Sequence, residues 1–410
     1  MRHFLTSMLI ALTIVFSSSV TLNSQTLDCF GIIAGCKATA DGSVMMAHNE
    51  DDGGEQMLNI YAVPASKDNV RYLWFEFPRM EQADSFINEY GVCIASDGCG
   101  SREDKGELTD GGVLYEVRVA VAKKAHSARE AVSIIGNMVE KYGYRGSGRT
   151  YVIADTKEGW ICSVVQGKHW VAQRVPDDCV MTIPNYYVIG KVDLSDKANF
   201  AGSPDIVDYA ISRGWYNPAK DGEFSFRLAY ASEKTLQNEN NHIRHNNAYR
   251  HFFGREKGDR EPIALKPLKP VTLEKMMEAL SLPVICNKGT ILATVFHLRG
   301  WLPLEEGCVA WNAMGRPNVS VFVPWYLGIT EVPAGFGRYS TPAEAEAKHL
   351  VDNKDFRKNY PDHFYWKYVD SWDVLTKRDK SLQRKMFKAA RKFDRSQVKD
   401  YNAFISELYK

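Results

Sequence analysis

The sequence predicts an α+β fold, in which two blocks of strands flank a pair of helices. Short apolar runs typical of strands recur up to residue 96, helical spacing then runs from Tyr115 to Tyr142, and strand-like runs resume at Thr150. A βαβ repeat would alternate single strands with single helices, and this chain does not. Its 410 residues and 45% hydrophobic content are enough for a large core. These observations favour a layered α+β domain over a Rossmann-type repeat.

The first block of strands opens with a hairpin. Residues 29–34 and 43–47 are short apolar or small-residue runs, and the polar turn 39–42 joins them. Further strands are expected at 59–63, 71–77 and 92–96, the last of them after the turn signal Asn88-Glu89-Tyr90-Gly91.

Two helices are predicted next. Residues 115–125 have helical spacing, and Ser127 with Glu130 forms a capping box that opens a helix over 131–142, ended by Gly143. Strands follow at 150–154, 159–165, 169–174 and 180–184, and later near 291–298, 307–314 and 319–325. Between these two groups, residues 192–270 are polar and loop-rich, with one helix expected near 204–214, and a second helix is expected at 272–280.

The N-terminus is typical of a signal peptide. A short basic start precedes an apolar run from Phe4 to Phe16, and Ser17-Ser18-Ser19-Val20 supplies small residues for cleavage. The run is shorter than the roughly 20 residues that cross a bilayer. We therefore expect a signal peptide at 1–24, a pro-segment at 25–28, a catalytic domain at 29–340 and a C-terminal helical extension at 341–410. An exported protein, periplasmic or extracellular, is expected.

Composition excludes several partner classes. Lys and Arg number 51 against 50 Asp and Glu, so no basic surface for nucleic acid is expected. No second long apolar run predicts a stable membrane span, and the sequence leaves a homo-oligomer open. The eight cysteines form no Cys-x-x-Cys pair and have no histidine at ligand spacing, so we predict no metal site and no cofactor. Cys93 and Cys99 are candidates for a disulfide, although buried free thiols fit as well.

Cys29 carries the chemistry. It follows the leader at the point where processing would make it the first residue, and its thiol would then attack while its own α-amine accepts the proton. A free α-amine has a pKa of about 7.7–8.0, which suits a base near neutral pH. A lipoprotein cysteine is the competing use of this position, but Asp28 before it fits poorly because lipidation favours a small residue there.

The segment from Cys29 to Asp51 resembles the N-terminal motif of the peptidase C69 dipeptidases, which are N-terminal-nucleophile (Ntn) hydrolases. In that family, Cys is followed by Gly-Lys-Lys-Ala-Ser-x-Asp-Gly-Ser and then by Ala-Arg-Asn-x-Asp. The chain keeps these spacings in Gly35–Ser43 and Ala47–Asp51. Similar stretches continue to Pro333, among them Trp170–Asp178, Pro184-Asn185 and Val321–Pro333. The resemblance implies a four-layer αββα sandwich, here with a C-terminal helical extension, and hydrolysis of dipeptides.

The resemblance also implies residue roles. Cys29 is carried over as the nucleophile with its amine as base, Asp51 as the acid that orients this amine, and Asn185 as a donor to the oxyanion. Arg250 falls where the family has an arginine after an aromatic residue, and we expect it to bind substrate.

Two departures from the family pattern bear on the substrate. His48 replaces the arginine of Ala-Arg-Asn, and Ala95-Ser96-Asp97 stands where the family often has Gly-Asn-Glu. We expect His48, Glu50, Ser96 and Asp97 to line the substrate site, with the acidic groups binding the free ammonium of a dipeptide and a backbone donor near Ser96 helping with the oxyanion.

The sequence thus predicts an exported cysteine dipeptidase that takes a small peptide substrate and works through a thioester. Two alternatives stay open. One is an N-acyl amide hydrolase, like the bile-salt and penicillin acylases or the phospholipase B-like proteins. The other is a non-catalytic exported relative that keeps the fold.

Overall fold

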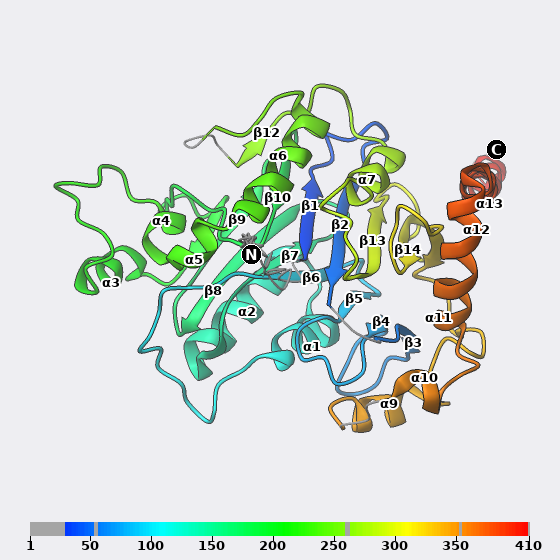
Figure 1. The fold of residues 1–410 in the computed structure, drawn as a ribbon, viewed down its shortest axis with the longest axis horizontal. Helices are drawn as coiled ribbons and strands as arrows, with labels where there is room; N and C mark the ends of the chain where they lie inside the picture. The colour runs from blue at the N-terminus through cyan, green and yellow to red at the C-terminus, as the bar shows by residue number, and fades with distance from the viewer. Residues whose placement is uncertain (1–28, 53–55, 259–262, 352–354, 409–410) are drawn as a thin grey trace, which may run out of the picture.

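Two antiparallel sheets, stacked face to face, form the centre of the protein (Figure 1). The computed structural model describes residues 29–52, 56–258, 263–351 and 355–408. Within them, the first sheet has seven strands in the order β12-β10-β1-β2-β13-β14-β15. The strands are, in that order, Ala264–Leu265, Val180–Ile183, Phe30–Ala34, Val44–Asp51, Thr290–Leu298, Cys308–Met314 and Val323–Tyr326.

The second sheet has eight strands among the described residues, in the order β11-β9-β8-β7-β6-β5-β4-β3. In that order they are Phe200–Gly202, Trp170–Val175, Gly159–Gly167, Tyr144–Ala154, Cys93–Gly98, Ser85–Asn88, Tyr72–Glu76 and Asn59–Val63. All pairings between named strands in both sheets are antiparallel.

Strand β1 is buried on both faces, which explains its apolar sequence. It lies between β10 and β2, with Ile33 paired to Met181 and Met46. Because successive side chains alternate, Ile33 packs between the two sheets while Phe30 and Ile32 pack on the opposite face of the first sheet. The predicted hairpin of residues 29–47 is therefore confirmed, and it occupies the middle of a sheet.

Helices cover the outer face of each sheet. Helices α1 (Tyr115–Lys124) and α2 (Ala128–Tyr142) pack on the eight-stranded sheet, and α6 (Glu239–Phe253) and α7 (Leu273–Leu280) pack on the seven-stranded one. The Ser127 hydroxyl caps α2 by accepting from the Glu130 amide, as predicted. Gly136 of α2 lies so close to Trp170 that a Cβ there would come within 2.1 Å of the ring. The predicted four-layer αββα sandwich is confirmed.

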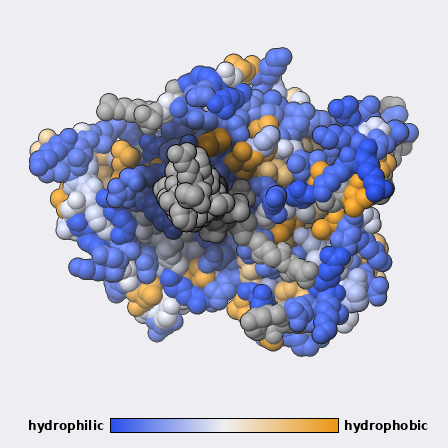
Figure 2. Space-filling model, in the orientation of Figure 1, coloured by the Kyte–Doolittle hydropathy of each residue, from blue (hydrophilic) through white to orange (hydrophobic). Residues whose placement is uncertain are grey.

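The remaining helices surround this sandwich. Their bounds are α3 Ile206–Ser212, α4 Phe226–Tyr230, α5 Glu233–Leu236, α8 Leu304–Gly307, α9 Pro342–Lys348, α10 Phe356–Asn359, α11 Phe364–Lys367, the π-helical turn Tyr368–Trp372, α12 Asp373–Arg378 and α13 Lys380–Leu408. Among the described residues, no helix combines the length and the apolar character needed to cross a membrane. Hydrophilic residues cover most of the face seen in Figure 2.

The C-terminal helices contact the edge of the seven-stranded sheet. Asp394 of α13 accepts from Tyr326 of β15 at 3.0 Å and pairs with the buried Arg299 at 3.0 Å. Tyr365 and Trp366 of α11 are buried and anchor this segment on the rest of the protein. The division at residue 340 stays a prediction, and the signal peptide and pro-segment lie outside the described residues.

Two expectations were wrong. Residues 192–270 contain the 15-residue helix α6, where the sequence predicted mainly loops. The proposed pair Cys93 and Cys99 cannot form a disulfide, because six residues of extended chain separate their Cα atoms by roughly 20 Å, against less than about 7 Å in a disulfide. All eight cysteines lie among the described residues, and all are free thiols.

Candidate active site

Cys29 lies immediately before β1, with its thiol between the two sheets. The side chain is 7% exposed, and Sγ donates to Glu50 Oε1 at 3.1 Å. The register explains this contact, because Phe30 pairs with Asn49 and the preceding residue therefore lies beside Glu50. The hairpin thus brings the predicted nucleophile and an acidic residue together.

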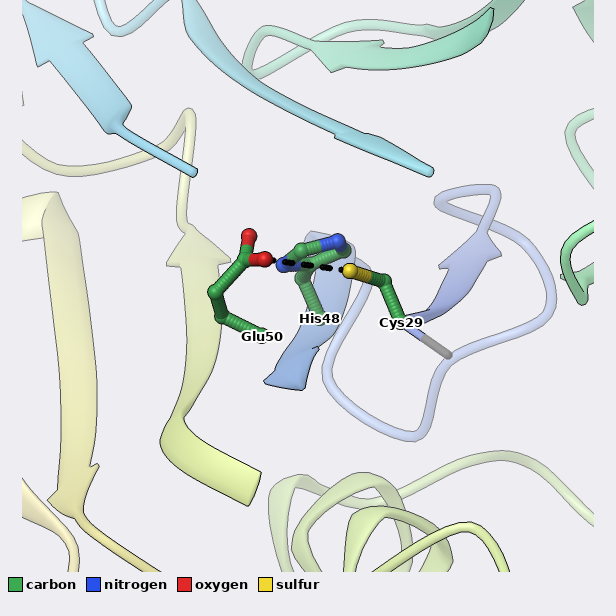
Figure 3. Close-up of side chains that lie close together, drawn as sticks. All are labelled: Cys29, His48 and Glu50. Atoms are coloured by element: carbon green, nitrogen blue, oxygen red, sulfur yellow. Dashed lines mark hydrogen bonds between the residues drawn. The ribbon is translucent and has the colours of Figure 1, made fainter. Parts of the chain in front are cut away.

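His48 and Glu50 lie on the same face of β2 as a result of strand alternation. Figure 3 shows their side chains on neighbouring positions of the strand, close to the Cys29 sulfur. One ligand atom from each of Cys29, His48 and Glu50 lies within 4.8 Å of the other two. Asn49, between them, points to the opposite face and donates to the carbonyls of Leu280 and Ile285.

Asp97 reaches the cluster from the facing sheet. Its Oδ1 lies 3.5 Å from His48 Nε2, and its side chain is fully buried. The approach depends on Gly31 in β1, since a Cβ there would lie 2.8 Å from Asp97 Oδ2. Asp97 therefore lies in the same cluster as His48, on the side of the eight-stranded sheet.

Asp51 ends β2 on the other side of Cys29. Its carboxylate accepts from Asn287, and its backbone N–H acts to lower the pKa of the Cys29 thiol, against the larger effect of burial. The Asp51 side chain is buried, as expected of a residue that holds a group inside the site.

Asn185 is tied to Cys29 through an arginine that sequence reasoning missed. Asn185 Nδ2 donates to the Gly98 carbonyl at 2.9 Å, and its Oδ1 accepts from Arg244 Nη2 at 2.7 Å. Arg244 Nη1 donates to the Cys29 carbonyl at 2.9 Å. Arg244 is fully buried on α6. A buried arginine with neutral polar acceptors has no local sequence signal, because its partners come from distant segments.

Two predicted substrate-binding residues lie outside the cluster. Arg250 is exposed on α6, where it pairs with Glu256, because six residues at 100° each turn it about 240° from Arg244. Ser96 is buried, but its hydroxyl accepts from Arg149 at 3.1 Å and from Arg118 at 3.4 Å. Neighbouring strand residues point to opposite faces, so Ser96 faces the helical layer while Asp97 faces Cys29. The roles predicted for the Ser96 and Arg250 side chains are thus corrected.

The buried acids make the surroundings of Cys29 electronegative. Burial first, and then the charges of Glu50, Asp97 and Asp51, raise the pKa of the Cys29 thiol. Burial also raises the pKa of Glu50 and of Asp51 to about 7 each. Burial alone lowers the pKa of His48, but Asp97 and Glu50 outweigh it and raise that pKa. A reactive thiolate is normally found in electropositive surroundings, so this pocket favours an added cation.

Several acidic oxygens in this pocket lack partners. Glu50 Oε2, Asp51 Oδ1 and Asp97 Oδ2 are buried and accept no hydrogen bond from any described residue. Buried oxygens without donors are costly, so a bound positive group would stabilise them. Chemically, the site can hold a thiol nucleophile, an amide donor and a group of positive charge.

The chain is similar in sequence to known peptidases. The model of "Peptidase family C69" matches residues 106–290. The "Probable dipeptidase" of Salmonella dublin is 24% identical in an alignment 375 positions long, which covers 78% of this chain and 86% of that protein. "Dipeptidase A" of Lactobacillus helveticus is 23% identical in an alignment 367 positions long, which covers 75% of this chain and 76% of that protein.

Among solved structures, the penicillin V acylase of Agrobacterium tumefaciens aligns with 76% of this chain and 89% of its own, at 12% identity. The TM-score of this alignment is 0.37. The family match lies outside the N-terminal motif of residues 29–51, and the likeness to dipeptidases extends over most of the chain. The chain is thus similar to peptidase family C69 over residues 106–290 and to dipeptidases over most of its length.

Proposed function

We propose that the protein is an exported dipeptidase whose nucleophile is the Cys29 thiol. The observation that carries the proposal is the position of this thiol at the start of a central strand, among three buried carboxylates, Glu50, Asp51 and Asp97. The names of its relatives, dipeptidases, point to the same activity. The apolar run that precedes Cys29 supports export.

The chemistry would begin once removal of residues 1–28 frees the Cys29 α-amine. The amine accepts the thiol proton, and the thiolate attacks the peptide carbonyl to give a tetrahedral oxyanion. Asn185 Nδ2 is the candidate donor to this oxyanion, with Arg244 holding both the Asn185 amide and the Cys29 carbonyl.

The intermediate then collapses in two steps. The C–N bond breaks, and the Cys29 ammonium gives its proton to the leaving amine, which leaves a thioester. Water, with the same amine as base, then attacks the thioester to release the acid and restore the thiol. Asp51 would orient the amine throughout.

Substrate choice would follow from charge. A dipeptide carries a free ammonium about one residue from its scissile carbonyl, and Glu50 and Asp97 offer unpaired carboxylate oxygens near Cys29. An N-acyl amide, the substrate class of the alternative reading, brings no positive charge to these oxygens. The geometry therefore favours the dipeptide.

The first test is N-terminal sequencing and intact mass of secreted protein, followed by assays with dipeptides and their N-acetyl derivatives. We expect a chain that starts at Cys29 and hydrolyses only the free dipeptides. Cys29→Ser should abolish turnover, while Cys36→Ser, in the turn after β1, should retain it. Equal kcat/KM for acetylated and free substrates would overturn the dipeptide assignment, and a mature chain that starts upstream of Cys29 and is still active would overturn the role of the amine.

A further inference from the structure

We propose that Cys29, His48 and Glu50 form a binding site for a thiophilic divalent cation of the zinc class, and that the bound ion reversibly blocks the nucleophile. The binding site stands on geometry alone. The blocking effect rests on the proposed function, because it requires Cys29 to be the nucleophile.

The first argument is the donor set. A thiol sulfur, an imidazole nitrogen and a carboxylate oxygen are the three ligand types that zinc prefers in proteins. His48 and Glu50 lie on β2, and Cys29 immediately precedes the adjacent strand β1. The pairing of the two strands therefore holds the three backbones in fixed register. Figure 3 shows the three side chains converging on a common point.

The second argument is distance. In a tetrahedral zinc site with bonds of about 2.0–2.3 Å, a sulfur and an oxygen ligand lie roughly 3.5 Å apart. Cys29 Sγ and Glu50 Oε1 are 3.1 Å apart, and the three ligand atoms lie within 4.8 Å of one another. Side-chain rotations alone would close the remaining gaps around an ion.

The third argument is that buried carboxylate oxygens at this site lack hydrogen-bond donors. Glu50 is 6% exposed, and its Oε2 accepts no hydrogen bond from any described residue. Asp97 is fully buried, and its Oδ2 likewise accepts no hydrogen bond from any described residue. Its Oδ1 lies 3.5 Å from His48 Nε2 without a hydrogen bond between them, so a small approach of the two groups would let this carboxylate orient the imidazole, as carboxylates do for histidine ligands in metal sites.

Softness decides which ion fits. A thiolate selects zinc-like ions over Mg²⁺ and Ca²⁺, which prefer oxygen ligands in larger numbers. On binding, the ion replaces the thiol proton, which leaves to solvent, and a sulfur–metal bond forms without any change of oxidation state. The sulfur lone pair is then engaged and unable to attack a carbonyl. Removal of the ion by a chelator reverses the process.

The test uses the mature protein, which begins at Cys29 and runs to the C-terminus, after treatment with a chelator. Co²⁺ is titrated in while the thiolate-to-cobalt charge-transfer absorption is followed, and Zn²⁺ is then added as a competitor. We expect a saturable band with one ion per chain that zinc abolishes. Cys29→Ser should lose the band, Glu50→Gln should bind about tenfold or more weakly, and Cys36→Ser should match the wild type.

Activity is measured on the same samples. We expect Zn²⁺ to stop dipeptide hydrolysis over the concentration range in which it displaces Co²⁺, with full recovery after chelation and no effect of Mg²⁺. An absent band, or a band that survives in Cys29→Ser protein with normal thermal unfolding, would overturn the site. Hydrolysis that requires the ion would overturn the blocking role.

The two proposals fail in distinguishable ways. Dipeptide hydrolysis without cobalt binding would leave the proposed function intact and refute the metal site. A Cys29-dependent band in a protein that cleaves no dipeptide would support the metal site and refute the proposed function.

Discussion

One guanidinium joins the predicted nucleophile to the predicted oxyanion donor: Arg244 donates from Nη1 to the Cys29 carbonyl at 2.9 Å and from Nη2 to Asn185 Oδ1 at 2.7 Å. Nη2 also donates to Asn241 Oδ1 at 2.6 Å. Three acceptors from separate segments are thus fixed by one planar group, a geometry that a lysine ammonium does not reproduce. Arg244 is a positioning residue, since it acts through Cys29 and Asn185.

We therefore expect Arg244→Lys to lower kcat about 100-fold while the protein still folds, because a displacement near 1 Å at a reacting group costs about that much. KM should change little, which a mere loss of stability would not produce. Arg250→Lys, on the exposed side of the same helix, is the control and should behave as wild type. Unchanged kcat in Arg244→Lys would contradict the positioning role.

Asn185 gives a second test, which separates the role of its amide N–H from that of its amide oxygen. Asn185→Ala removes the donor and should lower kcat about 10²–10³-fold, the usual effect of losing an oxyanion donor. Asn185→Asp keeps an oxygen for Arg244 but lacks the N–H, so it should be equally slow. Steady-state kinetics on both variants decides the matter, and a fast Asp variant would show that the amide donor is dispensable.

The packing of α2 on the eight-stranded sheet predicts an unusual result for Gly136→Ala. Alanine is favoured over glycine in a helix by about 1 kcal/mol. At Gly136, however, a Cβ would lie 2.1 Å from Trp170, and overpacking costs about 1–3 kcal/mol. We expect a net loss of stability in chemical denaturation. Asn137, the next residue, is exposed, so Asn137→Ala is the matched control and should leave stability unchanged or raise it.

A buried network ties residues 338–349 to the eight-stranded sheet. His349 Nδ1 lies 2.9 Å from Glu76 Oε1, and Nε2 lies 3.4 Å from Asp84 Oδ2. Arg338 Nη2 donates to the same Glu76 oxygen at 2.8 Å, and the Tyr115 ring stacks on His349. Burial alone lowers the pKa of His349, but Asp84 and Glu76 outweigh it and raise that pKa above its ordinary value.

The stability contributed by charged His349 should therefore depend on pH. A raised folded-state pKa stabilises the protein below the unfolded value of about 6.5, and this contribution is lost as pH rises through the folded value. His349→Gln should cost about 1–3 kcal/mol near pH 6 and less near pH 9. Urea unfolding of both proteins at the two pH values measures the difference. A cost that is equal at both pH values, or larger at pH 9, would refute the charged state.

Local patterns predicted the elements whose buried faces are apolar. The hairpin at 29–47, the Ser127 cap and the strands at 159–165 and 291–298 all followed from apolar runs and turn residues. Helix α6 was missed because the face it buries includes Asn241, Arg244 and His245, so hydrophobic periodicity is weak there. That helix supplies the arginine of the site.

For the site, too, the sequence predicted some residues and missed others. Cys29, His48, Glu50 and Asp51 lie within one hairpin, so spacing alone brings them together, and Asn185 and Asp97 followed from the family resemblance. Ser96 was misplaced because alternation along β6 depends on its register with β7, which the sequence does not state. Arg250 was predicted and Arg244 was missed because the position of α6 along the chain decides which arginine faces the core, and the sequence did not predict this helix.

The pairing of β2 with β13 has a consequence for the order of events during synthesis. β2 needs residues 290–298 as its neighbour, and Cys29 needs Arg244, 215 residues further on. At about 5–20 residues per second, roughly 10–50 s pass between translation of Cys29 and of β13. Throughout that interval the thiol lacks the groups that would make it a hydrolase. The predicted site can therefore assemble only after most of the chain has been translated.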